Sequence, residues 1–187
     1  MTSRFEIADA PLAGLKVIQR MPIGDERGWL ERMFCTTDLA EILGDRSVRQ
    51  VNRTHTRAPG TVRGMHYQVP PAAETKIVAC LRGSIFDVAI DVRHGSPTFL
   101  EWHAETLSEE NRRSLVVPEG FAHGLQALEP DTEILYVTTA AYDPAAERAL
   151  HALDPRVGVA WPLPVEHLSD RDQAHQFVDA DFAGVTL

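Results

Sequence analysis

The feature that most constrains the fold is a series of short strand-like segments separated by turn signals, from about Arg49 to Thr139. In the clearest segment, Ser84–Arg93, apolar side chains at every second position alternate with aspartate, alanine and arginine. Successive side chains of a strand point to opposite faces, so this pattern predicts one buried and one polar face. Turn residues flank the segment on both sides. A series of such strands is typical of an antiparallel sandwich or barrel.

The other elements are predicted by the same criteria. Two short helices are expected, one over Asp38–Leu43 that ends at Gly44 and one over Asp170–Val178 with Ser169 as its N-cap. The sequence therefore predicts an antiparallel β protein with small helical additions. The further strands are Val62–Gln68, Lys76–Leu81, Leu100–Thr106, Ser114–Val117, Gly124–Leu128 and Ile134–Thr138.

Length and charge narrow the class of protein. With 187 residues the chain has room for one sizeable core, so we expect a single domain over residues 1–187. We divide it into an N-terminal arm with a short helix (1–48), a β core (49–140) and a C-terminal segment (141–187). The 18 basic and 27 acidic residues give a net charge of −9, which argues against a general partner among nucleic acids or anionic membranes.

Cysteine content and hydropathy predict a cytoplasmic protein. Cys35 and Cys80 are too few for a disulfide framework or a cysteine-based zinc site. No segment approaches the roughly 18 apolar residues of a membrane span, and the N-terminus lacks the apolar run of a secretory signal.

Two histidines lie in unusual surroundings. His66 falls inside a predicted strand, and His123 ends the stretch Pro118-Glu119-Gly120-Phe121-Ala122-His123. Its Pro-x-Gly-x-x-His spacing resembles the second motif of the cupin superfamily, in which this histidine often binds a metal. The first cupin motif has two histidines separated by one residue, and the second of these positions is Gln68 here. An amide is a poor transition-metal ligand, so no metal is expected, although a metal-dependent cupin using His66 and His123 stays an alternative.

Six motifs occur in a fixed order along the chain: Arg63–Gln68, Glu74–Val78, Asp87–Arg93, Ser96–Phe99, Pro118–Gly124 and Trp161-Pro162. Together they resemble the dTDP-4-dehydrorhamnose 3,5-epimerase family, from about Gly24 to Asp172. The resemblance implies a cupin-type jelly-roll β barrel with a few short peripheral helices. It also implies a cofactor-independent epimerase that inverts C3, C5 or both in a nucleoside-diphosphate 4-keto-6-deoxyhexose, with a dTDP-linked sugar as the expected substrate.

Inversion of a carbon beside a ketone sets clear chemical demands. A base must face one side of the sugar ring and an acid the other, while a cation stabilises the enolate between them. The resemblance assigns the base to His66, oriented by Asp172, and the opposing acid to Tyr136. It puts Lys76, one of only two lysines in the chain, near the ketone oxygen.

The resemblance also implies a nucleoside-diphosphate site and a homodimer. Arg27 would reach across the dimer interface, and Tyr142 would stack on the base. Strict alternation puts Arg63 on the strand face opposite His66, so we predict a β-bulge at Gly64 that brings both to one side. The substrate-binding positions are Arg27, Gln50, Asn52, Arg63, His123, Tyr142, Glu147 and Arg171.

Several positions depart from the family pattern or receive no role. Arg32 stands where many members have a glutamate, which leaves thymidine recognition open, and His55 is either a pocket or a surface residue. We expect Asp87 and Asp91 on a solvated or ion-paired strand face. Four further histidines in polar or turn-like surroundings are expected at the surface: His94, His151, His167 and His175.

Two other functions stay open beside the metal-dependent cupin. The first is an epimerase that acts at C3 or C5 alone, in a natural-product or other nucleotide-sugar pathway. The second is a sugar-nucleotide binding protein without catalysis, although base, acid, carboxylate and lysine together argue against it.

Overall fold

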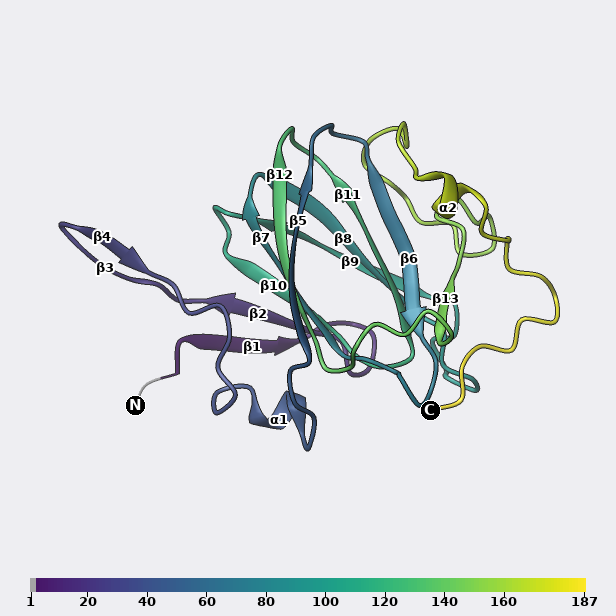
Figure 1. Cartoon of the computed structure of the whole chain (residues 1–187), viewed down its shortest axis with the longest axis horizontal. Coiled ribbons are helices and arrows are strands. Elements are labelled where there is room, and N and C mark those ends of the chain that lie inside the picture. The colour runs from purple at the N-terminus through teal and green to yellow at the C-terminus, as the bar shows by residue number, and fades with distance from the viewer. Residues whose placement is uncertain (1–2) are drawn as a thin grey trace.

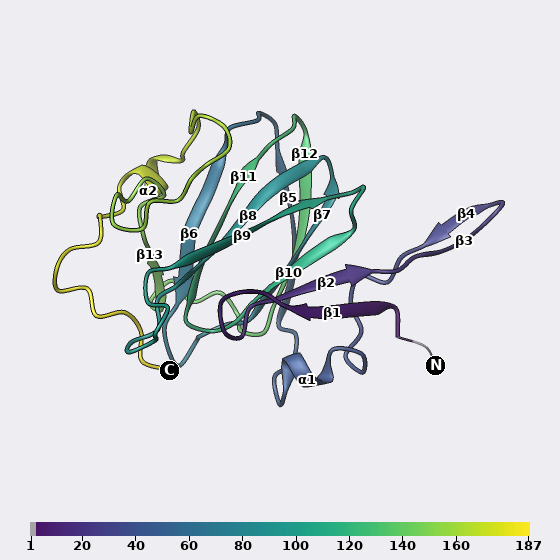
Figure 2. The same cartoon turned by 180° about the vertical axis from the view of Figure 1, so that it is seen from behind.

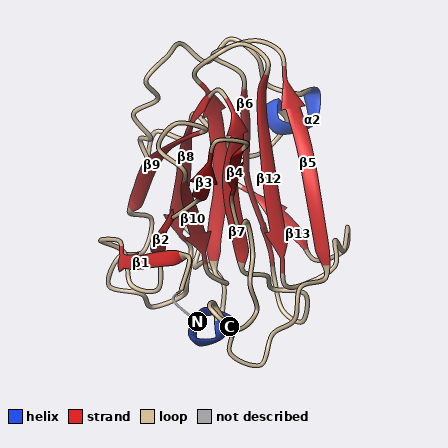
Figure 3. Cartoon of the chain, turned by 90° about the vertical axis from the view of Figure 1, so that its left-hand side faces the viewer, coloured by secondary structure: helices blue, strands red, loops and turns tan. Residues whose placement is uncertain are grey.

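Two antiparallel sheets pack face to face in the computed structural model, which describes residues 3–187 (Figure 1). Short helices lie outside the sheets, so the all-β jelly-roll architecture expected from the sequence is confirmed (Figure 3). The six-stranded sheet has the order β1 (Phe5–Asp9), β2 (Lys16–Arg20), β10 (Arg113–Val117), β7 (Lys76–Arg82), β12 (Thr132–Thr138), β5 (Gln50–Thr56). The five-stranded sheet has the order β13 (Glu147–Ala149), β6 (Val62–Gln68), β11 (Phe121–Ala127), β8 (Ser84–Asp91), β9 (Trp102–Ser108).

All seven strands predicted from the sequence are present, as β6 to β12, with ends that shift by a few residues. β9 begins at Trp102 because Leu100 has a φ of +65°, a conformation outside the β region. β5 has no apolar alternation to predict it, since both of its faces carry polar side chains. Gln50, Asn52 and Thr54 are half-buried, whereas the residues between them are exposed.

Both faces of β8 are buried, so of the two expectations for Asp87 and Asp91 the solvated face is wrong, whereas ionic partners are present: Arg93 for Asp91 and His123 for Asp87. Both aspartates are fully buried, on the face that packs between the two sheets with Ile85. The opposite face, with Val88 and Ile90, is also covered, because part of the C-terminal segment packs against it through apolar side chains. The strand that alternates most clearly therefore carries its polar side chains inside the sandwich.

Two short helices flank the sheets. α1 (Ala40–Leu43) packs Leu43 against the outer face of the six-stranded sheet. α2 (Asp170–Gln173) is shorter than predicted, but Ser169 is its N-cap as expected and accepts a hydrogen bond from the Asp172 amide at 3.1 Å. Within residues 3–187, neither helix has the length and apolar character needed to cross a membrane.

A hairpin of β3 (Ile23–Asp25) and β4 (Gly28–Leu30) projects away from the sandwich (Figures 1 and 2). It falls within the expected arm of residues 1–48, whose first two residues lie outside the described part of the chain. β1 and β2 come from the same arm and extend the six-stranded sheet. The hairpin exposes three large apolar side chains, Ile23, Trp29 and Leu30.

The bulge predicted at Gly64 is present where β6 pairs with β11. His66 lies opposite His123 and Arg63 lies opposite Leu125, so three steps along β6 match two along β11. Gly64 has a φ of +138°, and a Cβ atom there would lie 2.5 Å from the Gly124 Cα. Only glycine fits this close approach of two backbones, and the extra residue turns Arg63 and His66 toward the same cavity.

We therefore expect Gly64→Ala to lower the free energy of unfolding by about 2–4 kcal/mol, because it adds a backbone clash to a strained φ. The measurement is denaturant unfolding followed by circular dichroism. Gly95→Ala is the matched control: its φ is +72°, but nothing lies within 4 Å of the added Cβ. The control should lose only about 1 kcal/mol, and equal losses for the two variants would contradict the close-approach argument.

Candidate functional site

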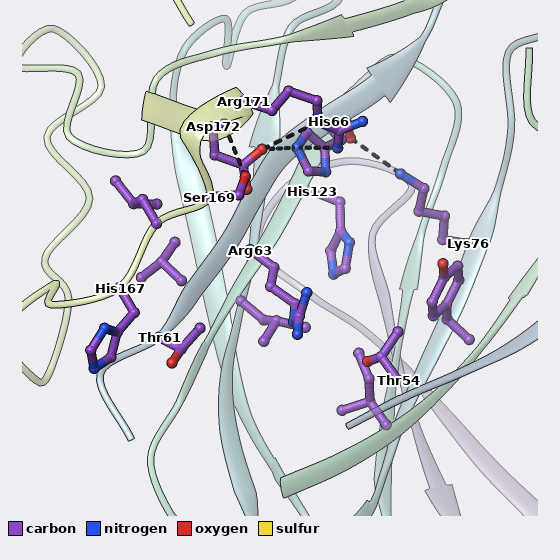
Figure 4. Close-up of a pocket in the computed structure, with 15 residues that line it drawn as sticks. Thr54, Thr61, Arg63, His66, Lys76, His123, His167, Ser169, Arg171 and Asp172 are labelled. Atoms are coloured by element: carbon purple, nitrogen blue, oxygen red, sulfur yellow. Dashed lines mark hydrogen bonds and ion pairs between the residues drawn. The ribbon is translucent and has the colours of Figure 1, made fainter. Parts of the chain in front are cut away.

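A cavity of about 650 Å³ opens along the interior of the sandwich and gathers much of the polar chemistry of the chain (Figure 4). An adjoining cavity of about 340 Å³ shares His66, Lys76, Tyr136 and Arg171 with it. Eleven of the twelve predicted site residues line these two cavities. In the large cavity they are Arg63, His66, Lys76, His123, Tyr136, Arg171 and Asp172, and the smaller one adds Gln50, Asn52, Tyr142 and Glu147.

His66 from β6 and Asp172 from α2 form a hydrogen-bonded pair, with 2.8 Å between Nε2 and Oδ1. Burial of Asp172 raises its pKa, but the hydrogen bond and charge of His66 and the Ser169 contact outweigh burial and leave the pKa below its usual value. Arg171 Nη2 lies 3.2 Å from the same His66 Nε2. Arginine can only donate, so the two contacts need opposite protonation of Nε2. The shorter contact, to a carboxylate, favours Nε2–H and leaves Nδ1 as the free base.

A second histidine–carboxylate pair lies deeper in the sandwich. His123 Nε2 is 2.8 Å from Asp87 Oδ1, and Asp87 is fully buried. Asp87 received no role from the sequence, because its strand face was expected to be solvated or ion-paired. The available signal is parity: Asp87 shares the sandwich-facing side of β8 with Ala89, whose register partner in β11 is His123.

Lys76 and Tyr136 complete the reactive groups. Lys76 Nζ lies 3.1 Å from Glu74 Oε1 and donates to the His66 carbonyl oxygen at 3.2 Å, so its ammonium group is held beside the histidine. Burial, and then the negative charge of Glu74, raise the pKa of Tyr136. The phenol therefore stays protonated at neutral pH, as a proton donor must.

The ends of the cavities carry groups suited to an anionic, partly aromatic ligand. Arg63 donates to Thr56 Oγ1 at 3.0 Å and leaves part of its guanidinium fork toward the large cavity. In the smaller cavity, Arg171 lies 3.3 Å from both Glu147 carboxylate oxygens, and the Tyr142 hydroxyl donates to Glu147 at 2.9 Å. Arginine forks bind phosphate in two-point contacts, and an exposed tyrosine ring offers a stacking surface.

Arg27 is the predicted site residue that lies apart from both cavities. It is 83% exposed on the projecting hairpin and pairs with Asp25. Arg32 pairs with Asp38 at 3.3 Å and lines neither cavity. His55 is exposed and lies 3.1 Å from Asp131, so it is a surface residue.

Two of the histidines expected at the surface lie at the site, one exposed as expected and the other half-buried. His167 is exposed but lines the mouth of the large cavity, and His175 is half-buried with Nε2 3.6 Å from Asp172 Oδ1. Because α2 ends at Gln173, the chain turns and brings His175 back against the His66 ring, with 5.9 Å between ring centroids. Because the sequence predicted a longer helix, over Asp170–Val178, the contact between His175 and His66 was not expected.

Gln68, at the position of the second histidine in the first cupin motif, has a structural role. Gln68 is buried, donates to the backbone oxygens of Ala72 and Ala141, and accepts from the Asp143 amide. Its amide is therefore fully occupied in anchoring a loop. Gln68 cannot serve as a ligand and His123 is held by the buried Asp87, so the residues present do not fit the metal-dependent cupin considered above.

The three tyrosines provide a test of these environments. Burial raises the pKa of Tyr67 and Tyr136, and a hydrogen bond to Glu147 raises that of Tyr142. We expect the ultraviolet absorbance of tyrosinate to rise with a midpoint above pH 10.0, the usual value, with one third of the amplitude lost in Tyr136→Phe. Denatured protein, which should titrate at the usual value, is the control. A transition in Tyr136 at or below pH 10.0 would contradict the assigned surroundings.

Comparison with known proteins gives a consistent result. A family model described as dTDP-4-dehydrorhamnose 3,5-epimerase matches residues 9–180. A dTDP-4-dehydrorhamnose 3,5-epimerase of Shigella flexneri is 42% identical over 161 residues, which cover 85% of this chain and 88% of the relative.

Solved structures agree with the sequence relatives. A dTDP-6-deoxy-D-glucose-3,5-epimerase from Legionella pneumophila, in complex with dTDP-4-keto-L-rhamnose, has a TM-score of 0.89 at 36% identity, covering 97% of this chain and 98% of that one. A 3'-monoepimerase from Streptomyces bikiniensis, in complex with dTDP-quinovose, has a TM-score of 0.83 at 31% identity, covering 90% and 85%. With its fold, its cavity and these matches, the chain belongs to the dTDP-4-dehydrorhamnose 3,5-epimerase family.

Proposed function

We propose that this protein is a cofactor-independent epimerase of dTDP-4-dehydro-6-deoxy-D-glucose that inverts C3 and C5. The observation that carries the proposal is that a histidine–carboxylate pair, a protonated phenol and an ammonium group line one cavity. Relatives in complex with dTDP-4-keto-L-rhamnose and dTDP-quinovose support a nucleotide-sugar substrate.

The reaction follows from the acidity of the carbons beside the C4 ketone. His66 Nδ1 removes the proton from C3 or C5, while Asp172 accepts from Nε2–H and stabilises the imidazolium that forms. The electron pair moves to the C4 oxygen, where the Lys76 ammonium stabilises the enolate. Tyr136 then donates its proton to the carbon from the opposite face. Exchange with solvent returns a proton to Tyr136 and removes one from His66, so each inversion leaves the enzyme unchanged.

The remaining groups bind the nucleoside diphosphate in this proposal. Arg63 and Arg171 contact the diphosphate, and Tyr142 stacks on the base. His123, fixed by Asp87, hydrogen-bonds the sugar from within the cavity, and Gln50, Asn52 and Glu147 line the nucleotide end. Local arginines allow a protein with a net charge of −9 to bind an anion.

A homodimer completes the site. Arg27 lies on a projecting hairpin with an exposed apolar surface of Ile23, Trp29 and Leu30, which suits burial against a second copy. In that arrangement Arg27 of one protomer reaches the nucleotide end of the other's cavity. The single domain of residues 1–187 and the cytoplasmic location stay predictions, as does the role of Arg32 in nucleotide choice.

Isotope incorporation tests the reaction. We expect incubation of dTDP-4-dehydro-6-deoxy-D-glucose with the protein in heavy water to place deuterium at both C3 and C5, because each inverted carbon takes its new proton from a solvent-exchangeable group. Nuclear magnetic resonance of the product locates the label. Deuterium at C3 or C5 alone supports the single-centre alternative, and label at neither carbon rejects the epimerase.

Two substitutions separate base from acid. His66→Asn should lower turnover about 10²- to 10⁴-fold, because an amide cannot accept the proton. Tyr136→Phe should retain deuterium exchange into the substrate while inversion slows, since His66 still removes and returns protons on its own face. His94→Gln, at an exposed histidine, is the control. If Tyr136→Phe loses exchange and inversion equally, Tyr136 is not the acid.

Mixing variants tests the shared site. If Arg27 serves the partner's cavity, homodimers of Arg27→Ala and of His66→Asn are each impaired, but a mixed dimer has one intact site. Random exchange of subunits should then restore about one quarter of wild-type activity per chain. If the activity of the mixture equals the average of the two variants, Arg27 does not act across an interface.

A further inference from the structure

His175 is a group at the site for which the proposed reaction has no use. Its Nε2 atom is buried without a hydrogen-bond partner and lies 3.6 Å from Asp172 Oδ1. His66 Nε2 lies 2.8 Å from the same oxygen. Each of the three side chains offers one ligand atom within 4.8 Å of those of the other two, and the described residues 3–187 hold no other group of three such side chains this close.

We propose that His66, Asp172 and His175 form an inhibitory site for a divalent transition metal of the Zn²⁺ class. Two imidazoles and one carboxylate are ligands that Zn²⁺ takes readily. In a tetrahedral site with bonds of about 2.0–2.1 Å, neighbouring ligand atoms lie about 3.3 Å apart. The observed separations of 2.8 and 3.6 Å from Asp172 Oδ1 bracket that value, so small side-chain shifts suffice.

The burial of His175 supports a ligand at this place. A buried ring nitrogen without a partner is destabilising, because it has lost its hydrogen bonds to water and gained none in the protein. Asp172 cannot satisfy it at 3.6 Å while it holds His66 at 2.8 Å. A metal between the three atoms gives His175 a partner and replaces the hydrogen bond between His66 and Asp172 with one metal bond to each.

The positive charge of Arg171 beside the site makes the metal a reversible inhibitor. The Arg171 guanidinium, with Nη2 3.2 Å from His66 Nε2 and Nε 3.7 Å from Asp172 Oδ1, repels a cation. Arg171 is 54% exposed and already contacts Glu147 at 3.3 Å, so it keeps a carboxylate partner if its guanidinium turns away from His66. Metal binding and diphosphate binding each require a change in the position of Arg171, so the metal and the substrate compete.

Occupation of the site removes the base through the tautomer of His66. A neutral imidazole carries one proton, and with Nε2 bound to metal that proton must lie on Nδ1. Nδ1 then has no lone pair with which to take a proton from the sugar. This inhibitory consequence rests on the proposed function, whereas metal binding itself does not.

Binding is measured first, on the full chain without a histidine tag and after treatment with chelator. Calorimetric titration with Zn²⁺ should give one site per chain, and Co²⁺ should give the visible absorption of a histidine-ligated ion. His175→Gln, which keeps a polar side chain but removes the ligand nitrogen, should weaken Zn²⁺ binding at least tenfold. His94→Gln, at an exposed histidine, is the matched control and should bind as wild type. Wild-type protein that binds no Zn²⁺, or His175→Gln that binds it equally well, overturns the proposal.

Inhibition is measured second, with each variant referred to its own metal-free rate of deuterium exchange. Zn²⁺ should inhibit the wild type reversibly, with recovery on addition of chelator, and the concentration for half inhibition should rise at least tenfold in His175→Gln. Equal sensitivity of the two proteins overturns the inhibitory role. If the protein binds Zn²⁺ through His175 but exchanges no deuterium when free of metal, the metal site is supported and the proposed function is rejected.

Discussion

The ionised carboxylate of Asp172 is the group on which the site depends, because it sets both the position of His66 and the ring nitrogen that is left free. Burial alone would raise the pKa of Asp172 and favour the neutral acid, but its contacts with His66 and Ser169 lower the pKa below the usual value. Ser169 caps α2, and α2 packs against β6, so the helix presents Asp172 to a residue 106 positions away in sequence. The Asp172 carboxylate is stabilised in its ionised form by its contact with His66, and this contact fixes the relative position of the two side chains.

The fold could be predicted largely because short strand-like segments are separated by turn residues along the core of the chain, with clear alternation in β8 and β9. All seven predicted strands are present, and the glycine bulge follows from the need to bring Arg63 and His66 to one side. The interior and exterior of β8 could not be assigned, because alternation shows that two faces differ but not which one lies between the sheets. β5 escapes prediction for the related reason that its inward side chains serve the cavity rather than the core.

The site residues show a similar division. Eleven of the twelve residues taken from the family resemblance line the two adjoining cavities, although neither periodicity nor composition singles them out. Asp87 and His175 were missed, since each contacts a histidine or carboxylate distant in sequence or in the next turn of the chain, and no pattern in the sequence shows that contact. Arg27 lies on the exposed hairpin, where a single chain cannot show what it contacts.

The C-terminal segment both covers a sheet and supplies Asp172. Val157, Val178 and Val185 pack on the outer face of the five-stranded sheet, and the buried Asp154 accepts from the Val178 amide. Detachment of this segment by local unfolding or proteolysis would uncover apolar surface and disconnect His66 from its carboxylate in one event. Occupancy of the cavity and attachment of the segment are therefore thermodynamically linked: any ligand that contacts Arg171 also protects the chain terminus from opening.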